Sequence, residues 1–153
     1  MRVTNYEVLL NGDRIPHLVK ESARNYAGNS CLTNPSQIAE FMRELYHADI
    51  LPEEKLWMNT KCKPLGVFEL AHGSMDSAVM DQKAIFTRLL LSGARGFVLV
   101  HNHPSGDSTP SEIDISNTKK VKEGAELLTI ELFDHIIVGD DTNYCSLREQ
   151  GNL

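Results

Sequence analysis

Two histidines separated by one residue, His101 and His103, are the first feature of this sequence that indicates chemistry. They follow a nearly all-apolar run, residues 96–100, which is typical of a strand covered on both faces. Side chains alternate between the two faces of a strand, so both imidazoles are expected to point the same way. The spacing therefore predicts that the two rings share one metal ion at the end of this strand.

A carboxylate follows on the next predicted element. Residues 109–112 read Thr-Pro-Ser-Glu, which supplies a cap at Thr109, a proline at the first helical position and a glutamate after it. Asp114 then falls about one turn into this helix and can offer an oxygen to the same ion. Two histidines and one carboxylate leave a fourth tetrahedral position for water, as expected of a catalytic zinc site.

Such a site supports hydrolysis, because bound zinc lowers the pKa of its water to about 7. A carboxylate base must still take the proton and pass one to the leaving group. Ser111, which precedes Asp114 in the same helix start, could donate a hydrogen bond to the oxyanion formed on a scissile carbonyl.

The full pattern is more specific than the histidine pair alone. His101-x-His103-Pro, followed after six intervening residues by Ser111-x-x-Asp114, resembles the motif of the JAMM (MPN+) metallopeptidase superfamily. Residues 101–107, His-Asn-His-Pro-Ser-Gly-Asp, resemble more narrowly the bacterial RadC-type JAB domain proteins, known as the DNA repair protein RadC family. Weaker resemblance to this family extends over residues 53–149, about two thirds of the chain.

This resemblance implies a JAMM/MPN-like (cytidine deaminase-like) mixed α/β fold with one Zn²⁺ per chain. His101, His103 and Asp114 are the implied metal ligands, and peptide or isopeptide hydrolysis is the implied chemistry. Members of the family often carry a helix-hairpin-helix region before the JAB domain, and residues 1–50 do not resemble one.

The general base is the least determined residue. In the superfamily the catalytic glutamate begins a core strand upstream of the histidines, and Glu54 fits this position best. Glu53 is one residue away and Glu69 is a more distant alternative.

Of three further residues, two have two interpretations each. His135, beside Asp134, is either a buried core histidine or a residue that orients a metal ligand. His72 is also interpreted as a buried core histidine. Asp107 follows a glycine and is either a turn residue or part of the site.

The elements that must position these residues alternate between strands and helices, which predicts an α/β domain with a mixed sheet flanked by helices. Residues 1–50 are predicted to form a hairpin-helix extension packed on the same domain, and residues 51–153 the JAB/MPN metallohydrolase domain. The predicted elements are a hairpin at 6–15, an irregular connection at 21–34, helices at 35–47, 81–93 and 110–127, and strands at 55–58, 65–71, 96–100, 130–138 and 144–147.

Composition limits the function classes. The chain has 153 residues, 41% hydrophobic and 24% charged, with a formal net charge of −6, which suits one globular domain. An acidic balance offers no broad surface for phosphates, so we expect weak or no direct nucleic-acid binding. The sequence has no signal-like start, no apolar run near 18 residues and no C-x-x-C pair, which predicts a cytoplasmic protein without a membrane segment.

The leading prediction is a zinc metallopeptidase or isopeptidase that acts on a peptide or protein substrate. The alternative is a non-catalytic metal-containing interaction module associated with DNA-repair or mobile-element complexes. DNA-repair partners are implied only by the family's name. A nuclease is disfavoured, because one His-His-Asp site on an acidic chain lacks both a paired-metal cluster and a surface for phosphates. The sequence makes no prediction of the oligomeric state.

Overall fold

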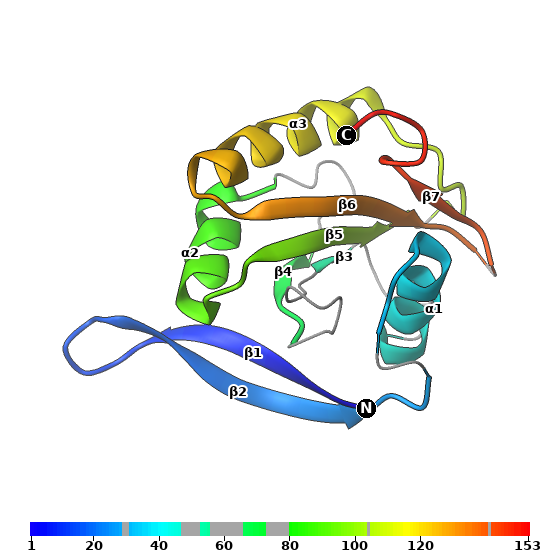
Figure 1. The fold of residues 1–153 in the computed structure, drawn as a ribbon. Helices are drawn as coiled ribbons and strands as arrows, with labels where there is room; N and C mark the ends of the chain where they lie inside the picture. Colours follow the sequence, from blue (N-terminus) through cyan, green and yellow to red (C-terminus); the bar gives the residue numbers. More distant parts are fainter. Residues whose placement is uncertain (29–30, 47–52, 56–65, 73–79, 104, 141) are drawn as a thin grey trace.

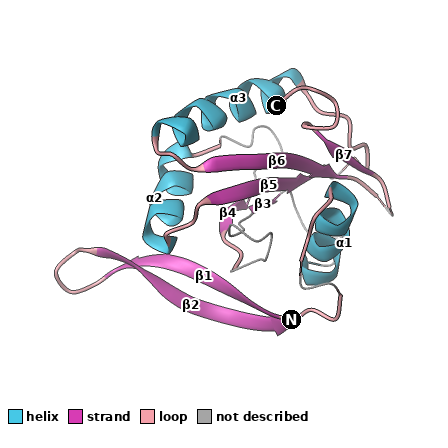
Figure 2. Cartoon of the chain, viewed as in Figure 1, coloured by secondary structure: helices cyan, strands magenta, loops and turns pink. Residues whose placement is uncertain are grey.

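The computed structural model describes residues 1–153 apart from 29–30, 47–52, 56–65, 73–79, 104 and 141. The described part contains a five-stranded sheet of order β4-β3-β5-β6-β7, a separate two-stranded sheet β1-β2, and helices α1 to α3 (Figures 1 and 2). This mixed α/β architecture confirms the predicted fold class.

A strand-helix-strand unit forms the centre of the domain. Strand β5 (Gly96–Asn102) runs parallel to β6 (Glu131–Val138), and α3 (Glu112–Leu127) connects them. The apolar composition of β5 suits a central strand, because Phe97 and Val98 are each no more than 1% exposed. Parallel strands place their carboxyl ends at one edge of the sheet, so the loop after β5 and the start of α3 meet there.

The remaining strands of the large sheet are short. Strand β3 (Glu53–Lys55) pairs antiparallel with both β4 (Glu69–His72) and β5. On the other side, β7 (Tyr144–Ser146) pairs antiparallel with β6. The predicted strand at residues 55–58 begins two residues earlier, and its residues 56–58 lie outside the described part.

Helices pack on both faces of this sheet. The α3 face receives Thr118, whose hydroxyl contacts His135 of β6. On the opposite face, Ile38 of α1 (Pro35–Tyr46) and Asp134 of β6 line the same cavity of about 410 Å³. Adjacent residues of β6 therefore face different helices, as strand geometry requires.

Helix α2 (Gln82–Ser92) begins and ends as its sequence predicts. The Asp81 side chain accepts a hydrogen bond from the backbone N–H of Ala84, which caps the helix. Gly93 follows the last turn with a φ of 63°, a left-handed conformation that glycine adopts without steric cost.

The amino-terminal hairpin is longer than predicted. Strands β1 (Arg2–Leu10) and β2 (Pro16–Asn25) pair antiparallel along their whole length, so residues 21–25 are strand and the prediction of an irregular connection there was wrong. Backbone pairing with β1 extends β2 through polar residues that show no strand preference of their own. Figure 1 shows the turn of this hairpin projecting away from the large sheet.

The base of the hairpin is attached to the body of the domain. Val67 donates its backbone N–H to the carbonyl of Thr4 at 3.0 Å, and its own carbonyl accepts from the N–H of Tyr6 at 3.2 Å. Val3 and Tyr26 at the same end join the hydrophobic core. The division of the chain into an extension and a JAB domain at residue 50 stays a prediction. No helix in the described ranges has both the length and the apolar composition needed to cross a membrane.

Candidate metal centre

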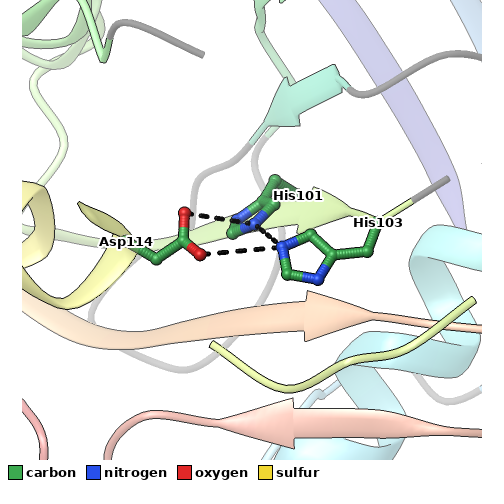
Figure 3. Close-up of side chains that lie close together, drawn as sticks. All are labelled: His101, His103 and Asp114. Carbon is green, nitrogen blue, oxygen red and sulfur yellow. Dashed lines mark hydrogen bonds and ion pairs between the residues drawn. The ribbon is translucent and has the colours of Figure 1, made fainter. Parts of the chain in front are cut away.

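The site lies at the edge of the sheet where β5 ends. His101 belongs to β5, His103 follows it directly, and Asp114 lies in the first turn of α3 (Figure 3). The Nε2 atoms of the two histidines are 2.9 Å apart. Each Nε2 is 3.6 Å from one carboxylate oxygen of Asp114, Oδ1 for His101 and Oδ2 for His103. The structure thus brings together the three side chains that the sequence selects.

The start of α3 places Asp114 in the site. Ser111, not Thr109, is the N-cap, so the helix begins at Glu112 and the predicted start was two residues too early. The Ser111 hydroxyl accepts from the backbone N–H of Asp114, and the Asp114 carboxylate accepts from the backbone N–H of Ser111. This reciprocal capping box forms because Asp114 stands three residues after a serine. It also holds the carboxylate beside the histidines.

A tight loop orients His103. Its Nδ1 lies 2.7 Å from the backbone carbonyl of Asp107. A carbonyl can only accept, so Nδ1 carries the proton and Nε2 presents its lone pair to the site. The Asp107 side chain accepts from the N–H and hydroxyl of Thr109, which confirms a turn role for this carboxylate.

Two glycines let this loop lie against the end of β6. Gly106 has a φ of 77°, in the left-handed region. A Cβ placed on Gly139 would lie 2.3 Å from the carbonyl oxygen of Gly106, closer than any real contact. Side chains larger than hydrogen at these two positions would therefore displace the loop that carries His103.

The Nδ1 side of the His101 ring contacts a buried histidine, His135. This Nδ1 is 2.7 Å from Nε2 of His135, and Nδ1 of His135 is 2.6 Å from the hydroxyl of Thr118. His135 and Thr118 are fully buried. His135 is thus a buried histidine with partners for both nitrogens, as one interpretation predicted, and it also contacts a candidate metal ligand, as the other predicted. Thr118 was not predicted, although its place four residues after Asp114 puts it on the same side of α3.

The environment separates the protonation behaviour of the two ligand histidines. Burial lowers the pKa of His101 to about 4. Hydrogen bonding to the Asp114 carboxylate raises the pKa of the less buried His103. Burial by itself would raise the pKa of Asp114, but its contact with the His103 imidazole and its hydrogen bonds from Ser111 hold it well below its usual range. At neutral pH the site therefore offers a neutral His101 and a charged carboxylate.

The donor set fits a zinc ion. Zinc bonds of about 2.0 to 2.1 Å in tetrahedral geometry place neighbouring ligand atoms about 3.4 Å apart. The separations of 2.9, 3.6 and 3.6 Å among the histidine nitrogens and their nearest carboxylate oxygens bracket that value. Within the described residues, His101, His103 and Asp114 form the group of possible ligand side chains close enough to hold a metal ion.

The other two predicted site residues are placed to different degrees. The Ser111 hydroxyl is 2.6 Å from Oδ2 of Asp114, so it adjoins the candidate metal ligands and in this arrangement donates to the carboxylate. The backbone of Glu53 and Glu54 forms β3, and the next residue, Lys55, pairs with Val100 beside His101. The side chains of both glutamates, and that of His72, lie outside what the structure describes.

A mixed sheet between helices, with two histidines and a carboxylate at the end of a central strand, is the arrangement of a JAB/MPN-like domain. Residues 32–152 match the family described as RadC-like JAB domain, and the chain belongs to this family. The matched region includes α1, whereas the β1-β2 hairpin precedes it.

Similar curated proteins carry the name UPF0758 protein. One from Desulfitobacterium hafniense is 35% identical over 123 residues, which cover 80% of this chain and 54% of that protein. One from Syntrophomonas wolfei is 32% identical over 140 residues, covering 86% and 59%. One from Bacillus licheniformis is 41% identical over 98 residues, covering 64% and 43%. The chain thus spans about half the length of the curated relatives it matches.

Proposed function

We propose that this chain is a zinc-dependent hydrolase of the JAMM type that cleaves peptide or isopeptide bonds, with one zinc ion held by His101, His103 and Asp114. The observation that carries the proposal is the convergence of two imidazole Nε2 atoms and one carboxylate at the end of β5. Membership of the RadC-like JAB family supports the same reaction class.

Three protein ligands are the number found in catalytic zinc sites, where a fourth position remains for water or substrate. Zinc held there supplies a Lewis acid and makes hydroxide available near neutral pH. His101 is buried and His103 and Asp114 are partly buried, so the site is partly accessible to solvent. This suits a reaction at the surface of a protein substrate.

Glu54 is the proposed general base. It takes a proton from the attacking water and passes one to the leaving amine. The position of its backbone in β3, next to the strand that carries His101, supports this role. Ser111 is the proposed donor to the oxyanion, for which its hydroxyl would turn from Asp114 toward the substrate oxygen.

The test compares two neighbouring glutamates. Glu54→Gln should leave zinc content and folding almost unchanged and reduce turnover by about 10² to 10⁴-fold, because a base is not a ligand. Glu53→Gln is the matched control and should have little effect, since adjacent strand residues face opposite sides. Turnover is measured on a panel of peptide and isopeptide substrates together with zinc content by elemental analysis.

Equal turnover in Glu54→Gln and the parent would remove Glu54 from the mechanism. A zinc-loaded parent that cleaves none of the panel would favour the non-catalytic interaction module. The acidic balance of the chain disfavours direct binding to nucleic acid, and the proposed reaction implies a peptide or protein substrate.

A further inference from the structure

We propose that Thr118 and His135 are positioning residues. Through a one-way chain of hydrogen bonds they keep the proton of His101 on Nδ1 and leave its Nε2 free to bind the metal. The chain links the backbone carbonyl of Asp114, the Thr118 hydroxyl, both nitrogens of His135 and Nδ1 of His101. It extends the proposed zinc site and concerns its protons, not its reaction.

The direction of donation along these hydrogen bonds is fixed at the end that lies in helix α3. The Thr118 hydroxyl lies 2.5 Å from the carbonyl of Asp114, one helical turn earlier. A carbonyl has no proton to give, so the single hydroxyl proton of Thr118 must lie in this contact. Threonine within a helix commonly donates to this carbonyl. The hydroxyl is then left as an acceptor toward His135.

His135 must therefore donate from Nδ1, which is 2.6 Å from the hydroxyl. The ring is fully buried between the neutral Thr118 hydroxyl and the His101 ring, where a second proton would bury a charge at high cost, so it carries one proton only. With that proton on Nδ1, the Nε2 atom of His135 is an acceptor. The contact of 2.7 Å to His101 then requires the proton of His101 to be on Nδ1.

The opposite direction would disable the ligand. If Thr118 donated to His135, the proton of His135 would move to Nε2 and that of His101 would also move to Nε2. His101 would then point an N–H at His103 and Asp114 in place of a lone pair. The carbonyl of Asp114 excludes this arrangement, because it would face a hydroxyl with no proton between them. Helix α3 thus supplies both a proposed ligand, Asp114, and the Thr118 hydroxyl, which sets the proton position of a second proposed ligand, His101.

His103 reaches the same state by a shorter route, since its Nδ1 donates directly to the carbonyl of Asp107. Both rings then present Nε2 lone pairs to each other at 2.9 Å, an unfavourable contact that a cation between them and Asp114 would relieve. The two histidines are therefore oriented in the same way: each Nδ1–H donates a hydrogen bond, and each Nε2 lone pair is left for the ion.

The experiment reads the proton positions directly. Nitrogen-15 NMR of the imidazole rings, on metal-free protein above pH 7, distinguishes Nδ1–H from Nε2–H rings. We expect His101 and His135 both to be Nδ1–H in the parent. Thr118→Val keeps the shape of the side chain but removes the acceptor, so His101 should shift toward Nε2–H. Zinc affinity, measured by titration against a competing chelator, should fall by about 10 to 100-fold.

Two variants separate positioning from general stability. Thr118→Ser retains the hydroxyl and should keep both the Nδ1–H signals and the parent's zinc affinity. Ser146→Ala removes another buried hydroxyl, which donates to Asp134 at 2.6 Å on the opposite face of the sheet. It should lower the unfolding temperature without changing either ring or the zinc affinity.

An Nε2–H ring at His101 in the metal-free parent would overturn the inference, and this spectrum decides the matter even if Thr118→Val does not fold. Thr118→Val that binds zinc as tightly as the parent would overturn it as well. A parent that binds no zinc would instead refute the proposed zinc site. Absence of hydrolytic activity in a zinc-loaded parent would refute the proposed reaction and leave the assignment of the protons supported.

Discussion

Strand β6 carries two buried polar residues side by side, Asp134 and His135, and they belong to networks of opposite kind. On the α1 face, the carboxylate of Asp134 accepts from the backbone N–H groups of His135 and Arg148 and from the Ser146 hydroxyl. Every bond of that network has a donor and an acceptor. Such a closed network satisfies buried polar groups and stabilises the connection between β6 and β7.

On the α3 face, the network that begins at Thr118 and His135 does not close. With the proton positions proposed above, it ends at His101 Nε2, beside His103 Nε2 and the Asp114 carboxylate, where acceptor atoms face one another. Buried acceptors without donors are unfavourable unless a cation joins them. The comparison indicates that the open end of a polar network, and not burial of polar groups as such, marks the proposed metal site in this domain.

The largest effect should follow from removing a group at the open end. His103→Ala deletes one of the three proposed ligands. The parent is expected to carry about one zinc ion per chain, and the variant should lose it. The fold should persist, because His103 is outside the core. Zinc content after dialysis, with circular dichroism as the control for folding, checks this. A variant that retained the parent's zinc would place the ion elsewhere.

A smaller effect is expected from acid. Zinc must displace the proton of His103, whose pKa is raised by its bond to Asp114, whereas burial lowers the pKa of His101 to about 4. Affinity should therefore begin to fall as pH drops through the raised pKa of His103, above the ordinary histidine value, with about one proton displaced per zinc between about pH 6 and 4.5. Calorimetry in buffers of different ionisation enthalpy counts the protons. Two protons displaced at pH 5.5 would contradict the separation of the two histidines.

The smallest effect on zinc should come from the closed network. Asp134→Asn keeps an oxygen acceptor for the two backbone N–H groups and replaces the carboxylate with a neutral amide. Burial disfavours the charge of the carboxylate, since burial raises the pKa of this group. We expect a change of about 1 kcal/mol in the free energy of unfolding and no change in zinc affinity. The same exchange at the open end, Asp114→Asn, should weaken zinc binding strongly. Equal losses of zinc affinity in both variants would remove the distinction between the networks.

The sequence predicted that the three candidate ligands lie together because their arrangement is local. His101 and His103 stand two residues apart at a strand end, and Asp114 begins the next helix, so strand and helix geometry alone bring them close. The resemblance to RadC-type JAB domains, carried by the same residues, was confirmed by the family match.

What the sequence did not reveal depends on tertiary packing. The contact of Thr118 with His135 exists because α3 lies across β6, and residues 17 positions apart carry no mark of that contact. The carbonyl of Asp107 is a backbone group, which residue types do not encode. The cap of α3 was misplaced because Thr109 and Ser111 both suit a helix start, and only the bond to Asp114 decides between them.

The most direct test of the zinc assignment is X-ray absorption at the zinc edge on the purified parent protein. The account predicts two imidazole nitrogens at about 2.0 to 2.1 Å and oxygen ligands at about 2.0 to 2.2 Å, with the imidazole contribution reduced or lost in His103→Ala. A sulfur ligand at about 2.3 Å, or a spectrum that is the same in the parent and in His103→Ala, would contradict it.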